Sequence, residues 1–220
     1  MLLVLESYKE IKSYYSRVGT ANLSGYELDH KPRLDFLVED LRLSQIKNKK
    51  VCDFGAGGGY ILRNMDPSNK LIAVDGFKVE DKLVREMYNL DLPFSEDFVS
   101  KHGQIDMAFS FEMFEHLTNP YNFMFELKKI LKEDGLLYFS VPHENCQHNT
   151  FYPGLLYPVE NLIEFFKQMA FDVLATKVHN KRFIQNVIIL RNKSWENIKM
   201  KWVKKGEKFH GQPPHVQVNL

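Results

Sequence analysis

The feature that most constrains the fold is a short apolar run that leads directly into a glycine-rich loop. Residues 50–54 read KVCDF, and Gly55, Gly57 and Gly59 follow at alternate positions before an apolar helical pattern. Glycine permits tight turns and close approach of the backbone to a ligand, because it has no Cβ. A helix after such a loop directs its N-terminal N–H groups at whatever the loop holds. The sequence therefore predicts a strand–loop–helix unit with a ligand at the carboxyl end of the strand.

Strand-length apolar runs alternate with helical patterns along most of the remaining chain. Further strands are predicted over residues 71–75, 83–90, 105–111, 136–141, 171–178 and 183–190, with a short helix as the alternative for residues 83–90. Helices are predicted over residues 60–65, 121–131 and 159–169. This alternation is typical of βαβ units and of a parallel sheet with both faces covered. The last two strands are joined by a short polar turn, which predicts an antiparallel finish.

The N-terminal region, residues 1–46, is predicted to be a mostly helical cap. Its clearest helical signal is an apolar face with i, i+3, i+4, i+7 spacing, formed by Leu34, Leu37, Val38 and Leu41. Pro32 fits the first turn of that helix, where a missing N–H costs nothing. Residues 16–30, which include two glycines, are predicted to form a loop or lid.

The near-equal numbers of acidic and basic residues exclude a strong overall positive charge. Lys and Arg number 29 against 28 Asp and Glu, for a formal net charge of +1. Nucleic-acid-binding domains carry a clustered basic excess, so nucleic acid is an unexpected partner. The same balance argues against a polybasic membrane anchor.

Cysteine usage and the N-terminus bear on the compartment. Two cysteines, Cys52 and Cys146, make neither a disulfide framework nor a zinc spacing, and Cys52 in its apolar strand is expected to be a buried thiol. The N-terminus is apolar for only five residues, too short for a signal peptide. No window approaches the length of a membrane span. The sequence therefore predicts a cytoplasmic location.

Details of the glycine loop discriminate between ligands. A dinucleotide fingerprint requires a small residue at the sixth position from Gly55, where this chain has Tyr60. Asp53 adds negative charge where a pyrophosphate would lie, and suits a ligand with a positive end. Asp75 ends the second strand about twenty residues later, where a carboxylate can accept both hydroxyls of a ribose. Ribose binding is common to NAD and S-adenosylmethionine, so Asp75 does not decide between them.

Five motifs in order resemble the class I S-adenosylmethionine-dependent methyltransferases. They are DFGAGGG (53–59), Asp75, DLPF (91–94), QIDMAFSFEMFEHLTNP (104–120) and LKKILKEDGLLYFSVPH (127–143). The FEMFEHL segment resembles the ubiquinone-biosynthesis O-methyltransferases and related small-molecule enzymes. The resemblance implies a Rossmann-like α/β fold, with a seven-stranded, mostly parallel sheet, one antiparallel strand and helices on both faces. Residues 47–192 would be the methyltransferase core, residues 143–157 an acceptor-side insertion, and residues 193–220 a tail or arm.

By position, the resemblance also implies residue roles towards S-adenosylmethionine, whose product form is S-adenosylhomocysteine. Asp53, Gly55, Ala56 and Gly57 would line the methionine moiety. Asp75 would hold the ribose hydroxyls, with Gly76 beside it. Asp91 and Leu92 would contact the adenine, and Phe111 and Glu112 would lie beneath the methyl group.

A cluster of acidic and imidazole groups follows the fourth strand. If that segment is helical, Glu112, Glu115 and His116 share one face, and such a set suits Mg²⁺, Zn²⁺ or Mn²⁺. Some relatives use this cluster with a divalent metal, whereas in others it shapes the cofactor pocket. The same sequence predicts catalytic roles for Glu112, His116 and His143, with His143 as a general base for the acceptor.

Several readings of function remain open at this level. The leading one is O-methylation of a small molecule, such as a sugar, a sugar-phosphate or a natural-product precursor. The alternatives are an RNA or protein methyltransferase of the same fold, a nicotinamide-dependent oxidoreductase, and an inactive binding subunit. The oligomeric state also stays open, with a homodimer as one alternative.

Overall fold

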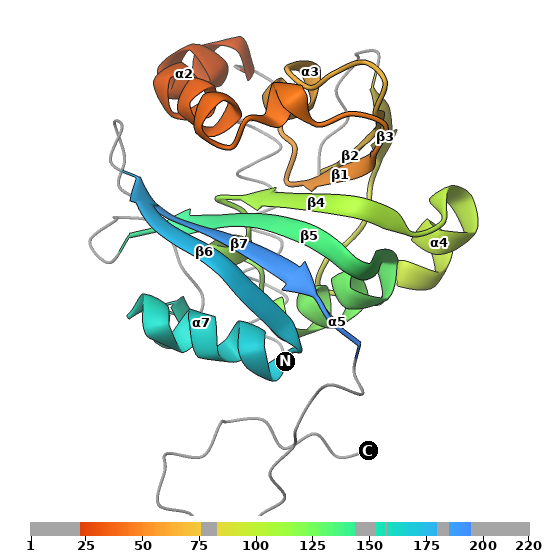
Figure 1. Ribbon diagram of the computed structural model, residues 1–220, viewed down its shortest axis with the longest axis vertical. Coiled ribbons are helices and arrows are strands. Elements are labelled where there is room, and N and C mark those ends of the chain that lie inside the picture. Colours follow the sequence, from red (N-terminus) through yellow and green to blue (C-terminus); the bar gives the residue numbers. More distant parts are fainter. Residues whose placement is uncertain (1–22, 76–82, 144–152, 157, 180–184, 195–220) are drawn as a thin grey trace, which may run out of the picture.

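Seven strands form a single sheet in the computed structural model, which describes residues 23–75, 83–143, 153–156, 158–179 and 185–194 (Figure 1). The strand order across the sheet is β3-β2-β1-β4-β5-β7-β6. The strands are β1 Lys50–Phe54, β2 Lys70–Val74, β3 Val84–Glu86, β4 Ile105–Phe111, β5 Leu131–Pro142, β6 Phe171–His179 and β7 Gln185–Asn192.

The helices lie on both faces of this sheet (Figure 1). They are α2 Leu23–Asp40, α3 Tyr60–Arg63, α4 Ser95–His102, α5 Pro120–Ile130, α6 Pro153–Leu156 and α7 Val159–Gln168. Two 3₁₀ turns, η1 Leu43–Gln45 and η2 Phe114–His116, complete the described elements.

Strand direction confirms the predicted architecture. The pairings from β3 through β5 are all parallel. β7 pairs antiparallel with both β5 and β6, so it is the one strand of opposite direction in the described sheet. The carboxyl ends of the parallel strands therefore meet at one edge, where ligands of open α/β sheets bind.

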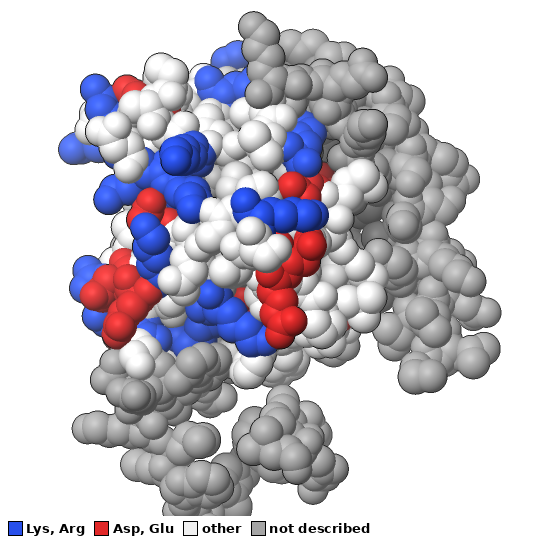
Figure 2. Space-filling view, turned by 90° about the vertical axis from the view of Figure 1, so that its right-hand side faces the viewer, with Lys and Arg blue, Asp and Glu red and all other residues white. Residues whose placement is uncertain are grey.

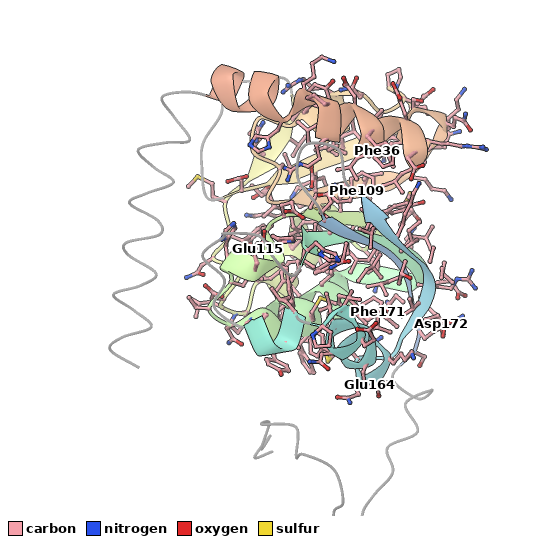
Figure 3. All side chains as sticks on the ribbon, turned by 90° about the vertical axis from the view of Figure 1, so that its left-hand side faces the viewer. Phe36, Phe109, Glu115, Glu164, Phe171 and Asp172 are labelled. Carbon is pink, nitrogen blue, oxygen red and sulfur yellow. The ribbon has the colours of Figure 1, made fainter. Side chains whose placement is uncertain are left out.

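Alternation along the strands separates two apolar cores. In β1, Cys52 and Phe54 belong to the core beneath α4, α5 and α7, whereas Val51 belongs to the core beneath α2 and α3. Figure 3 shows α2 lying across the second face, with Phe109 of β4 on that side of the sheet. Cys52 is fully buried, as predicted, and burial raises the pKa of its thiol. Side chains buried on both faces are typical of a parallel sheet.

The start of the first described helix corrects the sequence-based prediction. Leu34 and Leu37 are buried, as their spacing indicates, but α2 begins at Leu23 and Pro32 lies inside it. Residues 23–30 are therefore helical rather than a loop, and residues 16–22 lie outside the described residues. An internal proline removes one helical hydrogen bond. The leucines that follow Pro32 pack against the sheet, and this packing favours continuation of the helix.

Other boundaries also differ from prediction. The third strand is limited to Val84–Glu86, and β5 begins at Leu131, five residues before the predicted start. Helix α4 was missed, because its eight residues contain too few apolar positions to show a period. Its termini nevertheless carry a helix signature, with Glu96 and Asp97 in the first turn and a basic last turn. No helix among the described residues has the length and hydropathy to span a bilayer.

A buried carboxylate fixes the start of α4. Glu126 of α5 accepts hydrogen bonds from the backbone N–H groups of Phe94 and Ser95, each at 2.8 Å, and from Lys129 Nζ at 2.8 Å. Burial alone would raise the pKa of Glu126, but the bonds from Lys129, Ser95 and Phe94 lower it to about 2. This contact holds the end of the DLPF segment against α5.

We expect Glu126→Leu to lower the free energy of unfolding by about 3 kcal/mol, because it leaves two buried N–H donors without an acceptor. The folded pKa lies below the ordinary value. The ionised Glu126 side chain therefore makes its full contribution to the free energy of unfolding above about pH 4.5. This contribution declines as the pH falls towards 2. Urea unfolding of both proteins at pH 7 and pH 3 measures this difference. Lys129→Met removes a half-exposed partner and should cost less than about 1 kcal/mol; equal losses for the two variants would contradict the prediction.

Candidate active site

In the glycine loop between β1 and α3, two of the glycines pack closely against other side chains and a third does not. Gly55, Gly57 and Gly59 all have positive φ, at 81°, 50° and 80°. A Cβ on Gly55 would lie 2.6 Å from Met113 Cγ, and one on Gly59 would lie 2.6 Å from Leu83 Cδ1. A Cβ on Gly57 would meet no atom of the described residues within 4 Å. Packing therefore explains two of these glycines, whereas the third borders open space.

Backbone hydrogen bonds attach this loop to the neighbouring strand. The N–H groups of Gly55 and Ala56 donate to the carbonyl oxygen of Val74 at 2.8 and 3.2 Å. Gly59 N–H donates to Ala56 O at 2.7 Å and closes the turn that leads into α3. The loop is consequently held at the carboxyl ends of β1 and β2.

Two buried carboxylates lie beside the loop, one from each of these strands. Asp53 is 4% exposed and Asp75 is 9% exposed. Asp75 Oδ2 accepts the N–H of Gly57 at 2.5 Å. Burial, and secondarily the charge of Asp75, raise the pKa of Asp53 to about 7, against the opposing effect of Arg85. The sequence predicted both acids; Gly76, expected beside Asp75, lies outside the described residues.

A third carboxylate lies at the end of β4, on the side of the sheet covered by α2. Glu112 has φ +51°, and its N–H donates to Ser140 O at 3.1 Å and to Ser140 Oγ at 3.2 Å. Ser140 Oγ in turn donates to Glu112 Oε1 at 3.0 Å. Arg33 Nη1 of α2 lies 3.5 Å from Glu112 Oε2, and both side chains are less than 8% exposed. Burial raises the pKa of Glu112, while Arg33 and Ser140 oppose that rise.

The predicted metal cluster does not assemble among the described residues. The segment after Glu112 is not an α-helix: Glu112 is left-handed, and only the short η2 turn follows. Glu115 is fully buried against Phe114, Pro120, Leu155 and Leu156. His116 Nε2 lies 3.7 Å from Glu115 Oε1. The described part of the chain contains no group of three His, Cys, Asp or Glu arranged to hold a metal ion. The i, i+3, i+4 argument was wrong because it assumed helical geometry.

The DLPF segment connects β3 to α4 and is anchored by Asn119. Asp91 Oδ1 accepts the N–H of Asn119 at 2.6 Å, and Asn119 Oδ1 caps α5 by accepting the N–H of Asn122 at 3.2 Å. Leu92 is 56% exposed, whereas Phe94 is buried. The exposed Leu92 at this edge leaves an apolar surface beside the segment.

The structure brings most of the predicted residues to one edge of the sheet. Asp53 lies near the end of β1, and the glycines follow that strand. Asp75 follows β2, and Phe111 ends β4 directly before Glu112. His143 follows β5 and is partly buried; residues 144–152 of the predicted insertion lie outside the described residues. Sequence analysis missed Arg33, Arg85 and Ser140, because no local pattern distinguishes them from other surface or strand residues.

The comparisons with known proteins agree with this geometry. A family model described as "Methyltransferase domain" matches residues 27–180. The chain belongs to this methyltransferase family. This membership confirms the class I, S-adenosylmethionine-dependent resemblance drawn from the motifs, and it replaces the oxidoreductase reading.

Curated relatives of the methyltransferase include two ubiquinone biosynthesis O-methyltransferases. The protein from Glaesserella parasuis is 29% identical, and the match covers 50% of this chain and 56% of the relative. That from Yersinia enterocolitica is 27% identical, with 52% and 50% covered. The chain thus spans about half the length of the curated relatives it matches.

Solved structures support the fold at lower identity. A methyltransferase in complex with the Trm112 activator of Haloferax volcanii has a TM-score of 0.63 at 17% identity, covering 83% of this chain and 97% of that one. An S-adenosylmethionine-dependent methyltransferase from Anabaena variabilis has a TM-score of 0.61 at 12% identity, covering 83% and 95%.

Proposed function

We propose that this methyltransferase transfers the methyl group of S-adenosylmethionine to an oxygen atom of a small molecule. The observation that carries the proposal is the position of Glu112. Its carboxylate lies beneath α2, at the end of the strand beside the glycine-loop strand, held by Arg33 and Ser140. A carboxylate covered by a helix favours a small acceptor over a bulky one. A carboxylate there can accept the proton that a hydroxyl acceptor releases.

The described residues fit the cofactor at the glycine loop. The open space beside Gly57 allows a ligand to approach the backbone, and Asp75 places a buried carboxylate at the same loop. We propose that Asp53, Gly55, Ala56 and Gly57 line the methionine moiety. Asp75 would accept the ribose hydroxyls, with Gly76 adjoining; Asp91 and Leu92 would contact the adenine, and Phe111 and Glu112 the methyl-bearing end.

The chemistry requires alignment more than covalent assistance. S-adenosylmethionine, when bound, supplies a methyl group on a good leaving group, so the protein must hold an acceptor oxygen in line with it. Glu112 would orient the acceptor hydroxyl and accept its proton. His143, after β5 at the same edge, would contact the acceptor, and the partly buried His116 would line the same end of the site.

The proposed function is tested by titration calorimetry and by transfer of label. We expect micromolar binding of S-adenosylhomocysteine and no heat with NADH. Incubation with methyl-labelled S-adenosylmethionine and a panel of hydroxylated metabolites, RNA and protein extract should label a small molecule. Absence of S-adenosylhomocysteine binding overturns the cofactor assignment. Label found only in RNA or protein overturns the small-molecule assignment.

Asp53 gives the cofactor site a predicted pH dependence. Its pKa is about 7 in the folded protein, so its negative charge is complete only above neutrality. We expect affinity for the cationic S-adenosylmethionine to be full near pH 8.5 and to fall by about tenfold per unit as the pH drops below 7. Calorimetry from pH 5.5 to 8.5 measures this slope. Asp53→Asn should bind weakly with a flat profile; a steep profile in this variant would assign the dependence to another group.

A further inference from the structure

An arginine on the outermost parallel strand reaches across the sheet to the glycine loop. Arg85 of β3 pairs in register with Ala73 of β2, which pairs with Asp53 of β1. Residues directly opposite one another share a face of the sheet, so these three side chains form one row. Ala73 is fully buried and has only a methyl group, which leaves room above it for the long Arg85 side chain.

The Arg85 guanidinium ends on the loop itself. Its Nη1 donates to the carbonyl oxygen of Gly57 at 3.0 Å. Its Nη2 lies 3.1 Å from the position that a Cβ would occupy on Gly59. Arg85 therefore contacts the loop at the residue whose N–H binds Asp75. Asp75, after β2, thus accepts the N–H of Gly57, and Arg85 of β3 donates to its carbonyl oxygen.

The short strand that carries Arg85 is fixed from the opposite face. The neighbouring Glu86 projects to the other side of the sheet, where His102 Nε2 lies 2.9 Å from its Oε1 and Lys101 Nζ lies 3.3 Å from its Oε2. Glu86 O also accepts the N–H of Asp75 at 3.2 Å. The backbone of Arg85 is consequently held by α4 below and by the end of β2 beside it, although β3 has only three residues.

Arg85 also affects the ionisation of Asp53, in addition to its hydrogen bond with Gly57. Among the described residues, two charged groups act on Asp53: Asp75 after β2 raises its pKa, and Arg85 on β3 lowers it. A guanidinium remains charged at every physiological pH. Within the described part of the chain, Arg85 is therefore the cation that opposes the raised pKa of Asp53.

We propose that Arg85 is a positioning residue for the cofactor: it fixes the Gly57 carbonyl and places a positive charge on the same row of the sheet as Asp53. The inference rests on the proposed function. Arg85 would act on the cofactor through Asp53 and the Gly57 carbonyl. The sequence predicted no role for this residue.

The experiment compares Arg85→Lys with Arg85→Gln, because both retain an N–H donor and only Lys retains the charge. We measure S-adenosylmethionine affinity by calorimetry from pH 5.5 to 8.5. For Arg85→Gln, we expect the pH midpoint to rise by about one unit, which makes binding about threefold weaker at pH 7.5. For Arg85→Lys, the midpoint should stay within about 0.3 units of that of the wild-type protein, because the opposing charge remains.

A second readout needs no cofactor. Hydrogen exchange of the amides of residues 55–59 in the unliganded protein should accelerate in Arg85→Met relative to wild type, because the Gly57 carbonyl loses its donor. Arg63→Met is the matched control, since this exposed arginine of α3 binds the adjacent carbonyl of Gly58 and should leave the pH midpoint unchanged. Identical pH midpoints for the Lys, Gln and wild-type proteins, or unchanged exchange in Arg85→Met, overturn the inference. Failure of the wild-type protein to bind the cofactor, with altered exchange in Arg85→Met, overturns the proposed function and not the loop contact.

Discussion

Gly57→Ala should fold and yet lose at least about 100-fold in affinity for S-adenosylhomocysteine, which corresponds to about 2.7 kcal/mol. An alanine here carries a left-handed φ of +50°, which costs roughly 1–2 kcal/mol of stability. Its Cβ meets no atom of the described part of the chain within 4 Å, so these residues leave room for it. The methyl group would instead occupy the space that the ligand needs. Calorimetry measures the affinity, and thermal unfolding measures the stability.

Gly103→Ala provides a matched control for this prediction. Gly103 also has a positive φ, at +67°, but it follows α4 at the amino-terminal end of β4, away from the glycine loop. Its Cβ would approach only the flexible Lys50 Nζ, at 3.3 Å. We expect unchanged affinity for S-adenosylhomocysteine and a loss of stability at least as large as that of Gly57→Ala, because φ +67° with ψ 179° is a region that essentially only glycine adopts. If Gly57→Ala binds the ligand as tightly as Gly103→Ala does, the ligand does not lie against Gly57.

Glu112→Gln should lower the rate of methyl transfer to a hydroxyl acceptor by about 10² to 10⁴, because the amide cannot accept the proton. The affinity for S-adenosylhomocysteine should change by less than about threefold, since the side chain keeps its size. The substitution also leaves the Arg33 charge without its carboxylate, which we expect to cost about 3 kcal/mol of stability. Single-turnover rates with the acceptor identified by label transfer measure the first effect, and urea unfolding measures the second.

A double variant separates catalysis from stability. Arg33→Met with Glu112→Gln removes both charges of the buried pair and should recover most of the lost stability without recovering methyl transfer. Glu164→Gln, at an exposed position of α7 remote from the cofactor edge in Figure 3, should leave both properties unchanged. Recovery of transfer in the double variant would show that Glu112 contributes only to the fold.

The charged surface near β3 illustrates why the sequence alone did not identify every residue that supports the site. Figure 2 shows Lys, Arg, Asp and Glu side chains mixed over one face of the molecule, without a region of one sign. The networks of β3 and α4, such as Lys101 with Asp97 and Glu86, consist of ordinary surface residue types. The order of residues along the chain does not distinguish charged residues that support the site from those that only face solvent. The pairing of residues across strands identifies the supporting residues.

The amino-acid sequence by itself determined the strand alternation, the glycine loop with Asp53 and Asp75, and the methyltransferase family. These are local signals, since apolar periodicity, glycine at left-handed positions and a carboxylate at a strand end each occupy a few adjacent residues. Only the tertiary structure decided that the residues after Glu112 form a short 3₁₀ turn and not an α-helix, and that no metal cluster assembles among the residues it describes. It alone placed Arg33 against Glu112 and Arg85 over Ala73. Those contacts join elements far apart in the chain, and their geometry follows from sheet register and helix packing, which no single segment encodes.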